Sequence, residues 1–196
     1  MSELRPEAKF VEHPRYGCQP RLTGLNPQNN DGNIFLHWHS PLICRLENTA
    51  IAADLNQQVA ATIPVTHYYD VKRQCRDCER MFIFFAAEQK YWYEKLQFPL
   101  ESDCIRCYSC RAKQRQIAHN LKQYESLFHV ADRTIEQTLT MTECCLFLIE
   151  NQIFDPTPKL TQQIRRLLNT VPNEAKLKRR LEQIWQRFHN ITSEID

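Results

Sequence analysis

Glycine is scarce in this 196-residue chain, and other features that would define a protein class are missing too. Only three glycines and ten prolines occur, which excludes a collagen-like or low-complexity chain. The longest apolar runs, 81–87 and 144–149, are far too short to cross a bilayer. Residues 1–15 are polar and carry no apolar core of the secretory kind. The net charge of +2 is too small to indicate the partner.

Cysteine, in contrast, is abundant: the chain contains nine, and five of them fall within 36 residues. Without a secretory signal we expect a reducing cytoplasm, where clustered cysteines bind metal more often than they form disulfides. The five are Cys75, Cys78, Cys104, Cys107 and Cys110. They form one Cys-x-x-Cys pair, a spacer and a Cys-x-x-Cys-x-x-Cys run, close to the spacing of a four-thiolate zinc site. Four protein ligands leave no position for substrate, so we expect one structural Zn²⁺ ion.

The first part of the chain is irregular, with short strands. Alternating or β-branched side chains predict strands at 33–39, 60–71 and 81–85. The last two flank the Cys75–Cys78 turn, so the third strand is placed to form a hairpin. A helix is expected over 88–96, between the two cysteine groups.

Helical periodicity takes over after Cys110. Apolar faces predict four helices, each marked by the following residues: Ile117, Leu121, Tyr124 and Phe128; Ile135, Leu139, Leu146 and Ile149; Leu160, Ile164, Leu167 and Leu168; Leu177, Leu181, Ile184, Trp185 and Phe188. Asp132 is a plausible N-cap of the second. The short connection between the last two predicts an antiparallel hairpin. Within the second helix, adjacent Cys144 and Cys145 point in different directions, so at least one is expected in the core.

Five short motifs follow one another in the middle of the chain: Cys75-Arg76-Asp77-Cys78, Phe82-Ile83-Phe84, Ala87-Glu88-Gln89, Tyr93-Glu94-Lys95 and Arg106-Cys107-Tyr108-Ser109-Cys110-Arg111. In combination they resemble a probable zinc-ribbon family of bacterial proteins. The match covers roughly 45 residues, and it implies a compact treble-clef or ribbon-like zinc module with no particular reaction. Two departures stand out: Glu79 occupies a position where glycine commonly follows the first knuckle, and Cys104 adds a fifth candidate ligand.

The resemblance favours Cys75, Cys78, Cys107 and Cys110 as the zinc ligands, because flanking arginines mark the last pair. If the family's motif is instead aligned forward from Lys95 without a gap, the second pair of ligands is Cys104 and Cys107. A thiol–disulfide exchanger is a further alternative, but the thioredoxin-like βαβ pattern that usually carries such a motif is missing.

Two histidine motifs have structural and functional interpretations. In the predicted strand 33–39, His37 and His39 would share one face and could hold a metal or a catalytic base; one structural and one exposed histidine is the favoured interpretation. The sequence His13-Pro14-Arg15-Tyr16-Gly17 predicts a fixed turn. Its arginine and tyrosine could contact phosphate or a partner, although packing against the zinc module is favoured.

Basic residues concentrate in two stretches. Residues 159–189 contain eight basic residues against two acidic ones: Lys159, Arg165, Arg166, Lys176, Lys178, Arg179, Arg180 and Arg187 against Glu174 and Glu182. Arg111, Lys113, Arg115 and Lys122 follow the second knuckle. Such faces can bind nucleic-acid phosphates, although solvated helix faces are commoner.

We therefore expect an α+β protein: a small zinc-ribbon or treble-clef module with four cysteine ligands and a β-hairpin, followed by a helical region. The expected parts are 1–66, 67–116 and 117–196. The expected function is a non-enzymatic cytoplasmic adaptor or regulator that contacts another protein, with zinc stiffening the recognition surface. A nucleic-acid-binding protein is the first alternative. A metal-dependent nuclease or hydrolase using His37, His39 or His67 is the second, but no catalytic constellation supports it.

Overall fold

The chain divides into two compact units, which are described separately. The computed structural model describes residues 10–28, 33–155, 162, 166 and 175–193. The first unit is Met1–Ala112 and the second is Lys113–Asp196. The division at residues 66 and 116 stays a prediction. Small antiparallel strand pairs, helices and a cysteine cluster together confirm the α+β class.

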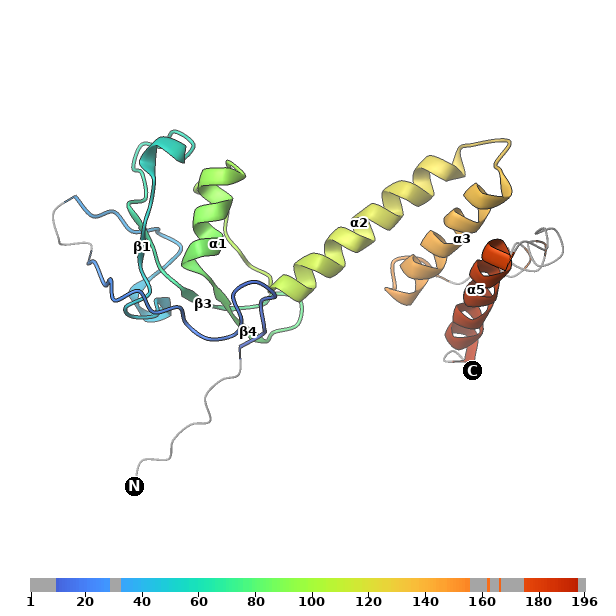
Figure 1. Ribbon diagram of the computed structural model, residues 1–196, viewed down its shortest axis with the longest axis horizontal. Coiled ribbons are helices and arrows are strands. Elements are labelled where there is room, and N and C mark those ends of the chain that lie inside the picture. The colour runs from blue at the N-terminus through green and yellow to red at the C-terminus, as the bar shows by residue number, and fades with distance from the viewer. Residues whose placement is uncertain (1–9, 29–32, 156–161, 163–165, 167–174, 194–196) are drawn as a thin grey trace, which may run out of the picture. The chain divides into compact units, whose positions relative to one another are not determined.

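The first unit contains two short antiparallel strand pairs (Figure 1). Strand β1 (Ile51–Ala52) pairs with β2 (His67–Tyr68), and β3 (Val71–Gln74) pairs with β4 (Met81–Phe84). The second pair is the hairpin predicted across the Cys75–Cys78 turn.

Two strand predictions were wrong in extent. Residues 33–39 make only an isolated bridge, between Leu36 and His67, and then enter a turn closed by the Ser40 N–H and the His37 carbonyl at 3.0 Å. The predicted strand 60–71 begins only at β2 and is interrupted before β3. A pair of strands only two residues long offers few ladder hydrogen bonds, so loop contacts decide these boundaries.

Helix α1 (Ala86–Lys90) lies beside the strand pairs and continues as the π-helical segment η3 (Tyr91–Lys95) (Figure 1). The predicted helix 88–96 is therefore present, but it begins earlier and changes its winding. Two 3₁₀ turns, η1 (Leu42–Cys44) and η2 (Leu55–Gln57), complete the unit's elements.

Asp70, in the two-residue link between β2 and β3, ties the first unit together. Its carboxylate accepts the N–H of Ala86, at the start of α1, at 2.7 Å and that of Arg21 at 2.8 Å. Its own N–H donates to the Thr49 hydroxyl at 3.0 Å. Burial raises the pKa of Asp70, and the two backbone hydrogen bonds to its carboxylate oppose that shift. One buried carboxyl thus joins the N-terminal segment to α1, the helix that lies between the two cysteine pairs in the sequence.

The second unit is helical. Helix α3 (Ile135–Glu150) packs against α5 (Ala175–Ser193), and α2 (Tyr108–Phe128) leads into this unit. Leu139, Leu146, Ile149, Ile184 and Phe188 form the shared core. Among the described residues, no helix combines the length and the apolar character needed to cross a membrane.

The cap of α3 differs from the prediction. Thr134, not Asp132, is the N-cap: its hydroxyl accepts the Gln137 N–H at 3.2 Å, and the Gln137 side chain accepts the Thr134 N–H at 2.8 Å. This reciprocal capping box satisfies two free helix donors, which a lone aspartate further upstream cannot do. Cys144 is buried, as predicted. The helix predicted around 160–168, and its hairpin with α5, lie outside the described residues.

Candidate metal centre

The first knuckle follows directly from the hairpin. Strand β3 ends at Gln74, and the turn that begins at Cys75 is closed by two backbone hydrogen bonds, Cys75 N–H to the Arg80 carbonyl at 3.0 Å and Glu79 N–H to the Cys75 carbonyl at 2.9 Å. The turn places Cys75 and Cys78 near each other. Glu79 adopts φ 58°, in the left-handed region. Glycine favours this region, which gives a physical reason for glycine at this position in the resembling family.

The second knuckle begins helix α2. Cys107 immediately precedes α2, and Cys110 lies in its first turn, where the Arg111 N–H donates to the Cys107 carbonyl at 3.0 Å. A helix N-terminus carries partial positive charge, which favours thiolate over thiol. A further backbone hydrogen bond joins the knuckles: the Arg76 N–H donates to the Ile105 carbonyl at 2.9 Å.

The two knuckles bring four sulfur atoms into one group. The Sγ atoms of Cys75, Cys78, Cys107 and Cys110 all lie within 4.8 Å of one another. The sulfurs of Cys78 and Cys107 are 3.8 Å apart. Four thiolates bound to one zinc ion at about 2.3 Å each surround it tetrahedrally, with sulfurs at this kind of separation. The donor set therefore fits a single structural Zn²⁺ ion.

The acidities of the thiols also fit a cation. Burial raises the pKa of Cys75, but backbone hydrogen bonds to its sulfur outweigh burial and bring the pKa to about 6. The donors are the amides of Cys107, Cys78 and Asp77. Burial raises the pKa of Cys107 and Cys110, and the neighbouring sulfurs raise that of Cys110 further. Four negative sulfurs this close repel one another, and a divalent ion compensates that repulsion.

Cys104 lies outside this group. It is buried, and its Sγ donates to the Arg106 carbonyl at 3.4 Å. Burial raises the pKa of Cys104 to about 12, so it is a neutral thiol at physiological pH. Its side chain packs with Phe82 and Phe84 of β4 beneath the knuckles. The structure thus places Cys104 in the apolar support of the site.

The charged residues of the motif brace the two knuckles. Arg106 pairs with Asp77 at 2.9 Å and so joins the second knuckle to the first. Arg111 pairs with the buried Glu88 of α1 at 2.7 Å, and its guanidinium lies over the Trp92 ring at 5.1 Å. A buried ion pair with one partner removed leaves an uncompensated charge, so both members of the Glu88–Arg111 pair are needed structurally.

Gln89, the last residue of the Ala-Glu-Gln motif, has a comparable role. Its side-chain amide donates to the carbonyl of Tyr69, in the link between β2 and β3, at 2.5 Å and to that of Phe84, in β4, at 2.9 Å. These hydrogen bonds give two carbonyls in the interior of the unit a partner. Sequence reasoning identified this motif through the resemblance, but it did not identify the partners.

The histidine motifs take structural places. His37 is buried; its Nε2 contacts the Leu100 carbonyl at 2.7 Å, and its Nδ1 accepts the His39 N–H at 3.1 Å. Burial lowers the pKa of His37 to about 4, so the ring is neutral. The turn that begins at His13 packs on the zinc module, as favoured: His13 contacts Glu88 at 3.5 Å and Tyr108 edge-on at 4.9 Å.

Several arginines of the basic stretches are engaged within the chain. Arg180 binds the Glu143 carboxylate through two hydrogen bonds of 2.9 and 2.7 Å, and Arg187 binds Glu150 through two of 2.8 and 2.6 Å. Both pairs join α5 to α3. Lys159 and Arg165 and the side chain of Lys176 lie outside the described residues. Lys178 and Arg179 are exposed.

A Cys-x-x-Cys turn within a hairpin, with a second one at the start of a helix, defines a zinc-binding treble-clef domain. Comparison with known families gives the same assignment: residues 69–119 match the sequence model of the family described as a probable treble clef domain. The match covers only this part of the chain, and there it confirms the zinc-ribbon or treble-clef resemblance seen in the sequence. No curated protein and no solved structure matches the chain significantly.

The strained residue of the first knuckle gives a testable expectation. Glu79→Gly should stabilise the zinc-loaded first unit by about 0.5–1 kcal/mol. The left-handed conformation costs a residue with Cβ about 1–2 kcal/mol, and glycine removes this cost. Part of the gain is lost because glycine has more conformational freedom in the unfolded chain. Thermal unfolding measures the change. Glu79→Ala is the matched control, because it removes the same charge but keeps Cβ; equal stabilisation by both variants would assign the effect to charge instead.

Proposed function

We propose that this protein is a non-enzymatic adaptor, in which the zinc-bound domain fixes a groove that binds an extended peptide segment of a partner protein. An apolar groove of about 610 Å³ in the first unit carries the proposal. Ile34, Phe35, Leu36, Trp38, Ala61, Thr62, Ile63 and Glu101 line it. Trp38 is 50% exposed and Ile63 56% exposed, so large apolar side chains face solvent along this groove. Contiguous apolar surface of this kind typically marks an interaction site.

A chain of contacts couples this groove to the zinc knuckles. Arg73 of β3 donates to the His39 carbonyl and, at 3.0 Å, to Asp103, whose carboxylate also accepts the Cys104 N–H at 2.8 Å. Residues 100–105 therefore connect the groove loop to the second knuckle. Zinc fixes that segment because Cys107 follows it.

The buried His37 fixes the aromatic side of the groove. His37 lies between Leu36 and Trp38, and its ring stacks on Trp38 at 4.7 Å and on the buried Tyr93 at 5.3 Å. The Tyr93 hydroxyl donates to the Ser102 carbonyl at 2.6 Å. An aromatic side chain held in this way loses little entropy on binding, which favours affinity.

The lining also defines the occupant. Within the described part of the chain, no backbone hydrogen bond joins 61–63 to another residue, so these groups are available to an added strand. Among the described lining residues Glu101 alone carries charge. We therefore expect the partner's segment to be extended. Its apolar side chains would contact Phe35, Trp38 and Ile63, and one lysine or arginine would pair with Glu101.

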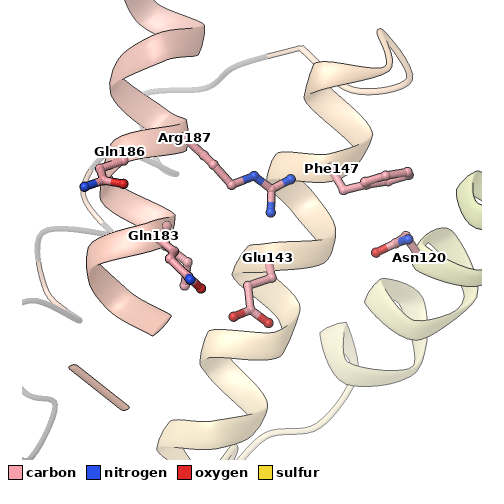
Figure 2. Close-up of a pocket in the computed structure, with 7 residues that line it drawn as sticks. Asn120, Glu143, Phe147, Gln183, Gln186 and Arg187 are labelled. Atoms are coloured by element: carbon pink, nitrogen blue, oxygen red, sulfur yellow. The ribbon is translucent and has the colours of Figure 1, made fainter. Parts of the chain in front are cut away.

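The recess in the second unit is a less favourable binding site than the groove (Figure 2). It has a volume of about 400 Å³, and its lining consists of Asn120, Glu143, Phe147, Gln183, Ile184, Gln186 and Arg187. Its two charged residues, Glu143 and Arg187, are the ones already bound to Arg180 and Glu150. A charged ligand would have to displace these pairs, which favours the first-unit groove as the binding surface.

Three observations support a non-enzymatic, protein-directed role. Both ring nitrogens of His37, one of the three candidate catalytic histidines, contact backbone groups. Arg111, Arg180 and Arg187 already pair with carboxylates, which reduces the basic surface available to nucleic acid. Four of the nine cysteines form one metal-binding group, which suits a reducing compartment, and we propose a cytoplasmic location.

A displayed library of random peptides tests the groove. Peptides selected on the zinc-loaded protein should share apolar residues and a lysine or arginine, and Trp38→Ala should weaken their binding by about 2 kcal/mol, or roughly 30-fold, because truncating a central aromatic anchor removes a hot spot. Glu101→Lys should shift selection toward acidic peptides. Zinc content, measured alongside, shows whether Trp38→Ala is still folded.

Ile153→Ala is the matched control, since Ile153 is 45% exposed in the second unit. Its binding should equal that of the unchanged protein. Selected peptides that bind Trp38→Ala as tightly as the parent would contradict the proposal. Salt-sensitive binding to DNA or RNA that is lost in Lys178→Glu/Arg179→Glu but unchanged in Trp38→Ala would replace it with the nucleic-acid alternative.

A further inference from the structure

A second surface of the first unit, which shares no residue with the lining of the groove, presents two arginines at one aromatic ring. The turn that begins at His13 closes through two hydrogen bonds of 2.8 Å, His13 N–H to the Gly17 carbonyl and Gly17 N–H to the His13 carbonyl. Gly17 adopts φ 77°, a conformation that residues with Cβ rarely take. The turn therefore places Arg15 and Tyr16 at a fixed position.

The Tyr16 ring is supported from within the unit. It stacks on His13 at 4.7 Å and contacts Phe85, the residue before α1, at 5.3 Å. His13 is itself buried against Glu88, and its Nδ1 accepts the Arg15 N–H at 3.2 Å. The ring is thus a rigid support, not a mobile surface side chain.

Two guanidinium groups lie on this support. The Cζ atoms of Arg15 and Arg21 lie 5.6 and 5.5 Å from the centroid of the Tyr16 ring. The backbone of Arg21 is fixed by its N–H bond to Asp70, at 2.8 Å. Both arginines are exposed. In the described part of the chain neither makes an ion pair within 4.0 Å, although Glu12 precedes the turn and the buried Asp70 carboxylate interacts electrostatically with Arg21. Arg111, the other arginine near His13, is bound to Glu88.

This arrangement differs from an ordinary basic surface. Two like charges near one ring repel each other, and cation–π attraction to Tyr16 offsets part of that repulsion. Within the described residues neither guanidinium donates a side-chain hydrogen bond, so the N–H donors of both remain available beside the ring. Each arginine can offer a two-donor fork, which matches the oxygen atoms of a phosphate group better than a lysine ammonium does.

We propose that Arg15 and Arg21, supported by the Tyr16 ring, form a binding site for a phosphate monoester dianion. Two arginines balance the charge of about −1.5 to −2 that a monoester carries near neutral pH, and its three terminal oxygens can accept from both forks. A phosphodiester carries one charge and two such oxygens, so it fits less well. The ligand's source is either a small phosphorylated metabolite or a phosphorylated side chain of a protein.

Titrations followed by NMR of the full, zinc-loaded chain test the site. Inorganic phosphate and a phosphoserine peptide should both shift the amide signals of Tyr16, Gly17 and Arg21, and the same peptide with serine should not. Arg15→Gln/Arg21→Gln should weaken both interactions about tenfold or more, as the loss of charge-assisted hydrogen bonds requires. Lys72→Gln removes an exposed charge from β3 of the same unit and should change neither.

The outcomes separate the sources and the alternatives. A phosphopeptide that binds far more tightly than inorganic phosphate assigns the site to a phosphorylated protein segment, whereas equal affinities assign it to small phosphate esters. Equal weakening by Lys72→Gln would reduce the effect to general charge attraction and overturn the proposal. Full retention of binding in Arg15→Lys/Arg21→Lys would also overturn the proposal, because the site requires the two-donor forks of arginine and not charge alone. Binding of single-stranded DNA in preference to both monoesters would overturn it as well.

Discussion

Removal of zinc by a chelator should unfold the first unit. Binding of a structural zinc ion contributes about 10–16 kcal/mol of apparent free energy, which equals or exceeds the whole stability of a typical domain, about 5–15 kcal/mol. The four thiols lie on the β3–β4 turn and at the start of α2, so the ion joins these two elements of the unit. Hydrogen exchange should show loss of protection across 67–112, whereas α3 should keep its protection because its core with α5 contains no metal ligand.

Single-cysteine variants make the same test without chelator. Cys78→Ala should lose zinc and should melt far below the parent, whereas Cys18→Ala should keep both, because Cys18 is outside the four-sulfur group. Elemental analysis gives the zinc content, and thermal unfolding gives the stability. A folded, metal-free parent, or equal melting temperatures for the two variants, would refute the structural zinc site.

The zinc module could be predicted because its information is local. Paired cysteines separated by two residues specify a turn geometry by themselves, and the strand before Cys75 and the helix after Cys107 follow from adjacent residues. The N-cap of α3 also depends on local sequence, yet Asp132 was predicted and Thr134 is observed. The capping box requires Gln137, which is a less conspicuous signal than an aspartate.

The groove and its support could not be predicted, because they depend on long-range contacts. Residues 33–39 alternate like a strand, yet the buried His37 is held by Leu100, 63 positions later, and the carbonyl of His39 by Arg73. Alternation describes a strand only if a partner strand is present over its length, and here the partner β2 is two residues long. The pairing of Glu88 with Arg111 likewise spans 23 positions.

The basic stretches show a different limit of sequence reasoning. Counting charges along residues 159–189 gives an excess of basic residues, but the count ignores the acidic face of α3. Glu143 and Glu150 lie seven positions apart, two helical turns, and so meet Arg180 and Arg187, which are also seven apart. Matching spacings on the two helices could have predicted this pairing once α3 and α5 were assumed to be neighbours.

The fifth cysteine gives the second large expected effect. Cys104→Ser should keep its zinc and its fold, because the Cys104 thiol only donates to the Arg106 carbonyl and a serine hydroxyl can make the same hydrogen bond. The cost should be about 1–2 kcal/mol for placing a more polar group in this buried position. Cys107→Ser and Cys110→Ser should instead lose the ion and unfold the first unit.

Zinc stoichiometry and thermal unfolding of the three serine variants distinguish the two possible ligand sets. Zinc prefers thiolate, and a serine hydroxyl, which is neutral at pH 7, replaces it poorly, so loss of a true ligand should appear as loss of metal. Cys104 is the matched control because it is as buried as Cys107, at 1% and 0% exposure, and packs in the same cluster. Tolerance of Cys110→Ser together with zinc loss in Cys104→Ser would show that Cys104 and Cys107 form the second knuckle, and that α2 begins with a structural thiol instead of a ligand.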